Sequence, residues 1–151
     1  MITLEEFKKK HSEKWRLIGL DLGSKRIGVS ICDEKQLIAT PLKTINRNTL
    51  NELISELKLI IDDNDIKGII IGNPLNMDGS SGRSAQSVKD TSKNIEKNFN
   101  LPICLWDERL STVGAFNLSS QLDINVSKRE KKIDENAATF ILQGAIDFLN
   151  N

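Results

Sequence analysis

Several acidic residues stand in this sequence where an apolar side chain is expected. Asp21 follows the apolar run of residues 17–20, and Asp107 and Glu108 directly follow another apolar run, residues 103–106. A carboxylate at the end of a buried strand costs on the order of several kcal/mol unless it is paired or bound to a metal ion. Acids in such places therefore predict a functional site. Taken alone, Asp21 has a simpler interpretation, as the cap of the glycine-containing turn that follows it.

Asp134 is a further acid, near the start of a helix predicted over residues 131–149. With about 100° of rotation per residue, its neighbours within about 40° on the helix are apolar: Ala138, Ile141, Ala145 and Phe148. Asp134 is therefore expected on the core-facing side. The alternative is an ordinary acid favoured by the helix dipole. Because Ser127 and Glu130 place the helix start near residue 128, Asp134 lies about two turns in, which weakens that alternative.

Acids that converge in this way are typical ligands of a divalent cation. Mg²⁺ and Mn²⁺ prefer oxygen, and Mg²⁺ is usually held by a few carboxylates together with substrate phosphate. Two such ions about 4 Å apart activate water and stabilise the leaving oxygen of a phosphodiester. Asp107 and Glu108 point to opposite faces of an extended strand, so only one of them is expected to face the site. The one that does not could bind Arg109 or cap a helix near Ser111. The residues alone do not separate the two acids.

Basic residues near these acids are candidates for binding phosphate. One group stands at the start of the last helix, where cations oppose the helix dipole: Lys128, Arg129, Lys131 and Lys132. Arg26, after Lys25, lies just past Asp21, and Arg83 opens a helix after the loop of residues 73–82. The group at the start of the last helix could instead be a solvated charge run, and the loop before Arg83 could be an ordinary strand-to-helix turn.

The elements that must position these residues follow from hydrophobic patterning. Strands are predicted at residues 16–22, about 26–32, about 36–45, 66–72 and 101–106, and helices from about 3 to 14, after Thr49, after the loop of residues 73–82, and over 111–122 and 131–149. This order predicts an α/β fold with a mixed sheet, in which an antiparallel three-strand meander is extended by parallel strands and helices cover both faces. Residues 1–14 are predicted to be an N-terminal helical extension of a domain over residues 15–151.

Composition narrows the class of protein. The chain has 151 residues, the size of one domain, with 21 basic and 21 acidic side chains, so no global field attracts nucleic acid. Cys32 and Cys104 lie far apart in apolar runs and predict buried, reduced thiols of a cytoplasmic protein. No apolar stretch has the length of a membrane span, and no signal peptide is recognised at the start. The lone His11 stands in a polar segment, which disfavours zinc or histidine-based chemistry.

Residues 19–29, with the sequence GLDLGSKRIGV, resemble the opening motif of the YqgF family, bacterial RNase H-like proteins described as pre-16S rRNA nucleases or Holliday junction resolvases. Residues 74–80 resemble the loop of that family, residues 107–112 its D-E-R motif, and residues 131–138 and 141–143 its C-terminal motif. The resemblance spans residues 16–149. One departure is Asn73, where an apolar residue is expected.

The resemblance implies an RNase H-like fold and a metal-dependent nuclease. It implies catalytic roles for Asp21, Glu108, Asp134 and Asp107, with Mg²⁺ or Mn²⁺ on the first three, and it is the main reason to prefer Glu108 to Asp107 as a metal ligand. Phosphate contacts are expected from Arg26, Arg83, Arg109 and Lys132. The expected substrate is precursor 16S rRNA, with branched DNA as the alternative, and the expected state is a monomer or weak homodimer with no membrane partner.

Two other classes of protein compete with this reading. The Asp-x-Gly signature after a first strand also opens sugar kinases and actin-like ATPases, but those folds need two such lobes and a longer chain. A catalytically silent nucleic-acid-binding module in ribosome assembly is the third reading. The acids disfavour it, because a pure binder gains by losing negative charge close to phosphate.

Overall fold

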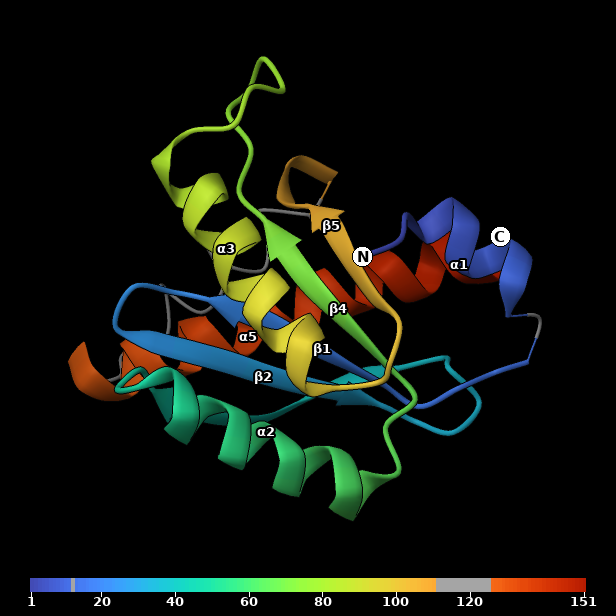
Figure 1. Cartoon of the computed structure of the whole chain (residues 1–151), viewed down its shortest axis with the longest axis horizontal. Helices are drawn as coiled ribbons and strands as arrows, with labels where there is room; N and C mark the ends of the chain where they lie inside the picture. The colour runs from blue at the N-terminus through green and yellow to red at the C-terminus, as the bar shows by residue number, and fades with distance from the viewer. Residues whose placement is uncertain (12, 111–125) are drawn as a thin grey trace.

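The computed structural model describes residues 1–11, 13–110 and 126–151, and between 126 and 135 it describes only the backbone. A five-stranded sheet forms the centre, with the order β3-β2-β1-β4-β5 (Figure 1). The strands are β1 (Leu17–Leu22), β2 (Arg26–Cys32), β3 (Ala39–Asn46), β4 (Gly68–Asn73) and β5 (Ile103–Asp107). β1, β2 and β3 pair antiparallel, whereas β1, β4 and β5 pair parallel. The predicted mixed sheet is therefore confirmed, with the first strand at its centre.

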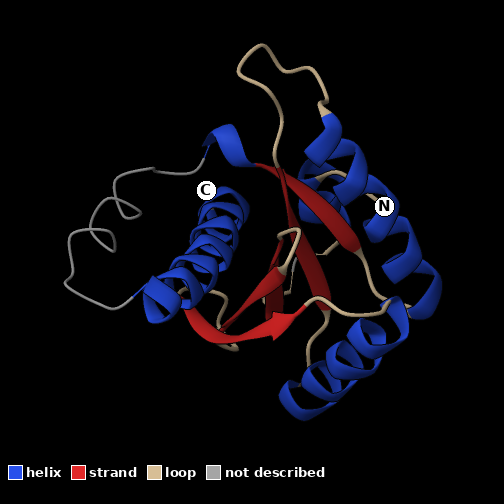
Figure 2. Cartoon of the chain, turned by 90° about the vertical axis from the view of Figure 1, so that its left-hand side faces the viewer, coloured by secondary structure: helices blue, strands red, loops and turns tan. Residues whose placement is uncertain are grey.

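Helices cover both faces of this sheet (Figure 2). On one face, α2 (Leu50–Asn64) and α3 (Arg83–Asn98) enclose a core that includes alternate residues of β1, among them Ile18 and Leu20. On the other face, α5 (Val126–Asn150) packs against a second core, which includes Leu17 of β1 and Ile70 of β4. The predicted helices on both faces of the sheet are therefore present. They follow from strand alternation, because a strand buried on both faces sends successive apolar side chains to opposite cores.

The short helix α1 (Leu4–Lys10) joins the α5 side of the molecule. Phe7 is only 2% exposed, and the backbone N–H of Ile2 donates to the Ile103 carbonyl at 3.0 Å beside β5. Thr3 caps α1 by accepting a hydrogen bond from the N–H of Glu6. The helix ends at Lys10, four residues before the sequence estimate.

Two further differences concern element boundaries. β3 begins at Ala39 rather than near residue 36, because the carboxylate of Asp33 accepts hydrogen bonds from the N–H groups of Leu37 and Ile38 and holds both in a turn. α5 begins at Val126, five residues before the range predicted from its apolar pattern and two residues before the start near residue 128 that Ser127 and Glu130 indicate. The helix predicted over 111–122 lies outside the described residues. Cys32 and Cys104 are buried free thiols, as expected. Within the described part of the chain, no helix has the combination of length and hydropathy that crossing a membrane needs.

Candidate active site

The candidate site lies where β1 and β4 end. The last pair of residues in register between these parallel strands is Leu20 with Ile71, so Asp21 and Gly72 are the next residues of the two strands. Asp21 is partly buried, and alternation from Leu17 places it on the face that α5 covers. A Cβ on Gly72 would lie 2.4 Å from Cδ1 of Ile141 in α5, so Gly72 belongs to the same face.

Glu108 reaches this point from β5. It opens a short 3₁₀ turn, η1 (Glu108–Leu110), directly after the strand. A Cβ on Gly72 would lie 2.8 Å from Oε1 of Glu108, so this carboxylate stands over Gly72, on the α5 face that Asp21 shares. Burial, and secondly the charge of Asp107, raise the pKa of Glu108. A carboxylate that is costly to ionise beside another acid is stabilised by a bound cation.

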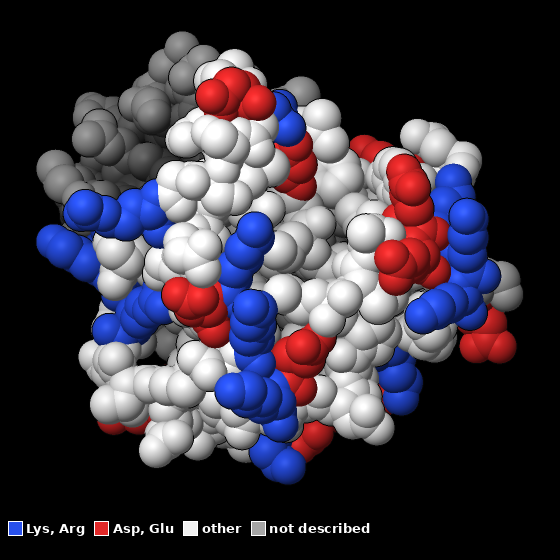
Figure 3. Space-filling model, turned by 45° about the horizontal axis from the view of Figure 1, so that its top comes forward, with Lys and Arg blue, Asp and Glu red and all other residues white. Residues whose placement is uncertain are grey.

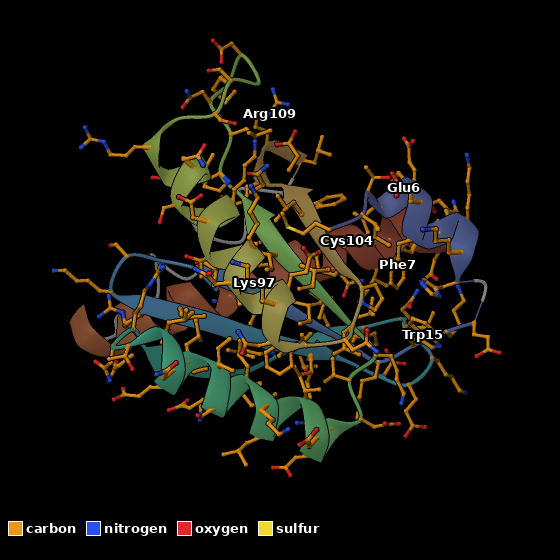
Figure 4. The ribbon with its side chains drawn as sticks, viewed as in Figure 1. Glu6, Phe7, Trp15, Lys97, Cys104 and Arg109 are labelled. Carbon is orange, nitrogen blue, oxygen red and sulfur yellow. The ribbon has the colours of Figure 1, made fainter. Side chains whose placement is uncertain are left out.

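Asp107 has a different environment from its neighbour. The guanidinium of Arg109 binds it in a fork, with Nε donating to Oδ1 at 3.0 Å and Nη2 donating to Oδ2 at 2.7 Å. These hydrogen bonds hold the pKa of Asp107 below its usual range. Nη1 of the same guanidinium donates to the Met77 carbonyl at 3.2 Å, so Arg109 joins the end of β5 to the loop after β4 (Figure 4). The structure thus distinguishes two acids that the residues alone did not separate.

The path of α5 directs its first turns toward the same end of the sheet. Oγ of Ser30 in β2 donates to the Ala138 carbonyl at 2.7 Å, and Nδ2 of Asn150 donates to the Gln36 carbonyl beyond the far end of β2. The helix therefore runs away from the end where Asp21 lies as its residue number rises. Residue 134 comes one turn before Ala138, about 6 Å further toward that end. The side chains of Asp134 and Lys132 lie outside the described residues.

Two other basic candidates, Arg26 and Arg83, lie around the end of the sheet at which Asp21 stands. Arg26 opens β2, two residues before Gly28, which is in register with Asp21. Arg83 is exposed at the first position of α3. Figure 3 shows the Lys and Arg side chains (blue) in separate groups, with acidic side chains among them, so this face has no uniform basic surface.

Two residues near the site were not singled out from the sequence. Ser30 is fully buried and bonds the α5 backbone, although a serine in an alternating strand gives no sign of this. Arg47 donates to the Gly23 carbonyl at 2.9 Å and to Oγ1 of Thr91 at 2.8 Å, and so holds the turn that follows Asp21. A polar residue between a strand and a helix cap carries no pattern that predicts such a contact.

Among the described residues, no group of three potential ligand side chains surrounds a common point. The side chain of Asp134 lies outside the described part of the chain, so only two of the three predicted ligands, Asp21 and Glu108, can be compared. Both are oxygen donors, and one has a pKa raised by burial and by a neighbouring negative charge, so the donor set fits a hard divalent cation such as Mg²⁺ or Mn²⁺.

Comparisons with known proteins agree on the family. The RuvX family profile, described as Holliday junction resolvase, matches residues 15–148. A protein of Pelagibacter ubique named "Putative pre-16S rRNA nuclease" is 75% identical over 151 residues and the full length of both chains. A Rhodobacter capsulatus protein of the same name is 46% identical over 88% of this chain and 84% of its own.

Solved structures show the same fold. RuvC of Thermus thermophilus in complex with a Holliday junction substrate superposes with a TM-score of 0.57, at 10% identity, over 87% of this chain and 93% of that one. RuvC of Thermus thermophilus in a second structure gives a TM-score of 0.54 at 8% identity, with the same coverage. At such identities the likeness concerns the fold alone, an RNase H-like mixed sheet. With the profile spanning almost the whole chain, this chain belongs to the RuvX family, the YqgF family of the sequence motifs.

Proposed function

We propose that this protein is a cytoplasmic, divalent-metal-dependent nuclease that hydrolyses a phosphodiester bond near the 5′ end of precursor 16S rRNA. The observation that carries the proposal is the placement of Asp21 and Glu108 around Gly72, on the face toward which the first turns of α5 run. The names of the two relatives support the choice of RNA.

In this proposal Asp21, Glu108 and Asp134 hold Mg²⁺ or Mn²⁺. The bound metal would supply an activated water and charge stabilisation for the leaving oxygen. Glu108 contributes a carboxylate whose burial favours pairing with a cation over remaining ionised alone. Asp107 is assigned a supporting role, because its oxygens are already occupied by Arg109. In this proposal Glu108 binds the metal, whereas Asp107 holds Arg109 in place.

Phosphate contacts are assigned to Arg26, Arg83 and Lys132, which come from three separate elements around the same end of the sheet. Arg109 was also expected to bind phosphate. Its fork with Asp107 and its bond to the Met77 carbonyl instead favour a positioning role, with at most part of its charge available to substrate.

Branched DNA is the second candidate substrate. The observation in its favour is the fold shared with RuvC, together with the description of the family profile. Symmetrical resolution of a junction calls for a two-fold dimer, whereas trimming of an RNA end can be done by a monomer. We propose a monomer or weak homodimer, so the mass in solution bears directly on the choice of substrate.

The test compares the wild type with Asp21→Asn on a precursor 16S 5′ fragment and on a four-way DNA junction, each with Mg²⁺, Mn²⁺ or chelator. Asp21→Asn keeps the size of the side chain and removes its charge, so cleavage should disappear while binding stays equal or improves. Cleavage that survives in Asp21→Asn refutes the site. A wild type that binds both substrates and cuts neither under any metal is a silent binding module instead.

A further inference from the structure

The loop between β4 and α3 has a compact tip, residues 76–80. The N–H of Asn76 donates to the Ser80 carbonyl at 2.9 Å, and the N–H of Gly79 donates to the Asn76 carbonyl at 2.8 Å. Oδ1 of Asp78 accepts from both the N–H and the hydroxyl of Ser80, at 2.9 and 2.6 Å. The tip is thus closed by its own hydrogen bonds, and Figure 1 shows it projecting beyond the sheet.

Arg109 fixes this tip to the candidate site. Its Nη1 donates to the Met77 carbonyl, while the rest of the guanidinium is held by Asp107, the residue before Glu108. Gly79 has a φ of +88°, and a Cβ there would lie 3.4 Å from Nη1. Any residue with a side chain would be strained at this positive φ, so glycine favours the turn. The hydrogen bond from Arg109 to the Met77 carbonyl then joins the loop backbone to the end of β5.

The side chains at the tip are unlike those of a phosphate site. Met77 is 89% exposed, more than any other large apolar side chain in the described part of the chain. Beside it, Asp78 is an acceptor whose pKa is lowered by the Ser80 hydroxyl and N–H, so it stays ionised at neutral pH. A carboxylate repels phosphate but accepts hydrogen bonds from the amino groups of bases, and methionine packs against aromatic rings.

We propose that residues 76–80 form a base-contacting element, in which Met77 packs on the face of a nucleobase beside the scissile phosphodiester and Asp78 accepts a hydrogen bond from a base amino group. This inference rests on the proposed nuclease function and narrows its substrate. Apolar side chains that enter a base stack must separate neighbouring bases. The element therefore selects nucleic acid with unpaired or easily unstacked bases near the cleaved bond, and gains nothing on an uninterrupted duplex.

The test uses the full chain in chelator, so that binding is measured without cleavage. One RNA is a hairpin with a single-stranded 5′ extension that carries 2-aminopurine, and the other is a blunt duplex of the same sequence. The variants are Met77→Ala and Met77→Leu, with Leu59→Ala as a matched control, because Leu59 is an exposed leucine (64%) on α2, away from the site. Anisotropy gives affinity, and 2-aminopurine fluorescence reports unstacking.

Met77→Ala should bind the extended hairpin about tenfold more weakly, within the range for loss of one stacking side chain, and lose the 2-aminopurine signal. Met77→Leu should retain most of both, and Leu59→Ala all of both. Blunt-duplex binding should not change in any variant. Equal binding of Met77→Ala and Leu59→Ala on the hairpin overturns the inference, as does an equal loss on both RNAs. A Met77→Ala effect on self-association with unchanged RNA binding assigns the tip to a protein interface.

The same proteins with Mg²⁺ or Mn²⁺ separate this inference from the proposed function. If the wild type cleaves and Met77→Ala matches Leu59→Ala in binding and cleavage, only the role of the tip is wrong. If the wild type neither binds nor cleaves, the proposed nuclease function fails, and the base-contacting role fails with it.

Discussion

The carboxylate of Glu108 stands over Gly72 so closely that a methyl group on the glycine would lie 2.8 Å from Oε1. The same methyl group would also lie 2.4 Å from Cδ1 of Ile141 in α5. Glycine at this position is therefore a condition for two things at once. It allows α5 to lie on the sheet, and it leaves room for an acid from β5 beside Asp21 on β1.

Gly72→Ala should consequently displace Glu108 as well as strain the core. Overpacking of this kind costs about 1–3 kcal/mol of stability. Gly144→Ala is the matched control, because its Cβ would meet the Trp106 ring at 2.8 Å on the same face, and its three nearest atoms all belong to Trp106. We expect similar losses in urea midpoint for both variants, but a fall in kcat of more than about tenfold only for Gly72→Ala. Equal kcat values in the two variants would show that the position of Glu108 does not matter.

The Asp107→Asn variant should change the pH dependence of cleavage. The negative charge of Asp107 contributes to the raised pKa of Glu108, after burial. If ionised Glu108 holds the metal, activity is lost as pH falls through the pKa of Glu108. Removing the charge of Asp107 lowers that pKa, so the acid limb of kcat/KM should move to lower pH. Glu108→Gln, measured alongside, should have no measurable kcat at any pH. An acid limb that stays in place or moves to higher pH contradicts this coupling.

Most of the fold could be predicted from the sequence, because strand alternation and helix capping are local signals. Ile27 and Val29 are buried as their alternation implies, and Thr49 caps α2 by accepting from the N–H of Glu52. The boundary of β3 could not be predicted, since Leu37 and Ile38 have strand-like side chains but their N–H groups bind the Asp33 carboxylate.

The sequence names the acids of the candidate site but not how they are arranged. Strand alternation separates Asp107 from Glu108, but it cannot say which face meets Asp21. That answer depends on Gly72 in β4 and on the guanidinium of Arg109, contacts that exist only in the folded chain. The roles of Asp134 and Lys132 remain predictions, because their side chains lie outside the described residues.

The variant Asn73→Leu tests the one departure from the family pattern that the sequence showed. Its Oδ1 is buried and has no hydrogen-bond partner in the described structure, a state that costs about 1–3 kcal/mol. Asn73→Leu should therefore raise the free energy of unfolding by about 1 kcal/mol in urea denaturation. Ser30→Ala is the opposite control, since it removes a buried hydrogen bond to the Ala138 carbonyl and should lower stability by a similar amount. A less stable Asn73→Leu protein would mean that the amide is satisfied in solution.

Charge-neutral replacements should identify the phosphate contacts. Arg83→Gln, Arg26→Gln and Lys132→Gln are each expected to weaken RNA binding at all sequences and to reduce the slope of log K against log salt by about 1. Lys35→Gln provides the control, because Lys35 is exposed in the turn between β2 and β3, at the opposite end of the sheet from the start of β2. Anisotropy titrations between about 50 and 200 mM salt, in chelator, give the slopes. A contact to phosphate lowers both affinity and slope, whereas a solvated surface charge behaves like Lys35. Slopes equal to the wild type in all three variants would therefore show that these residues are solvated surface charges. Other residues would then have to bind the phosphate backbone of the substrate.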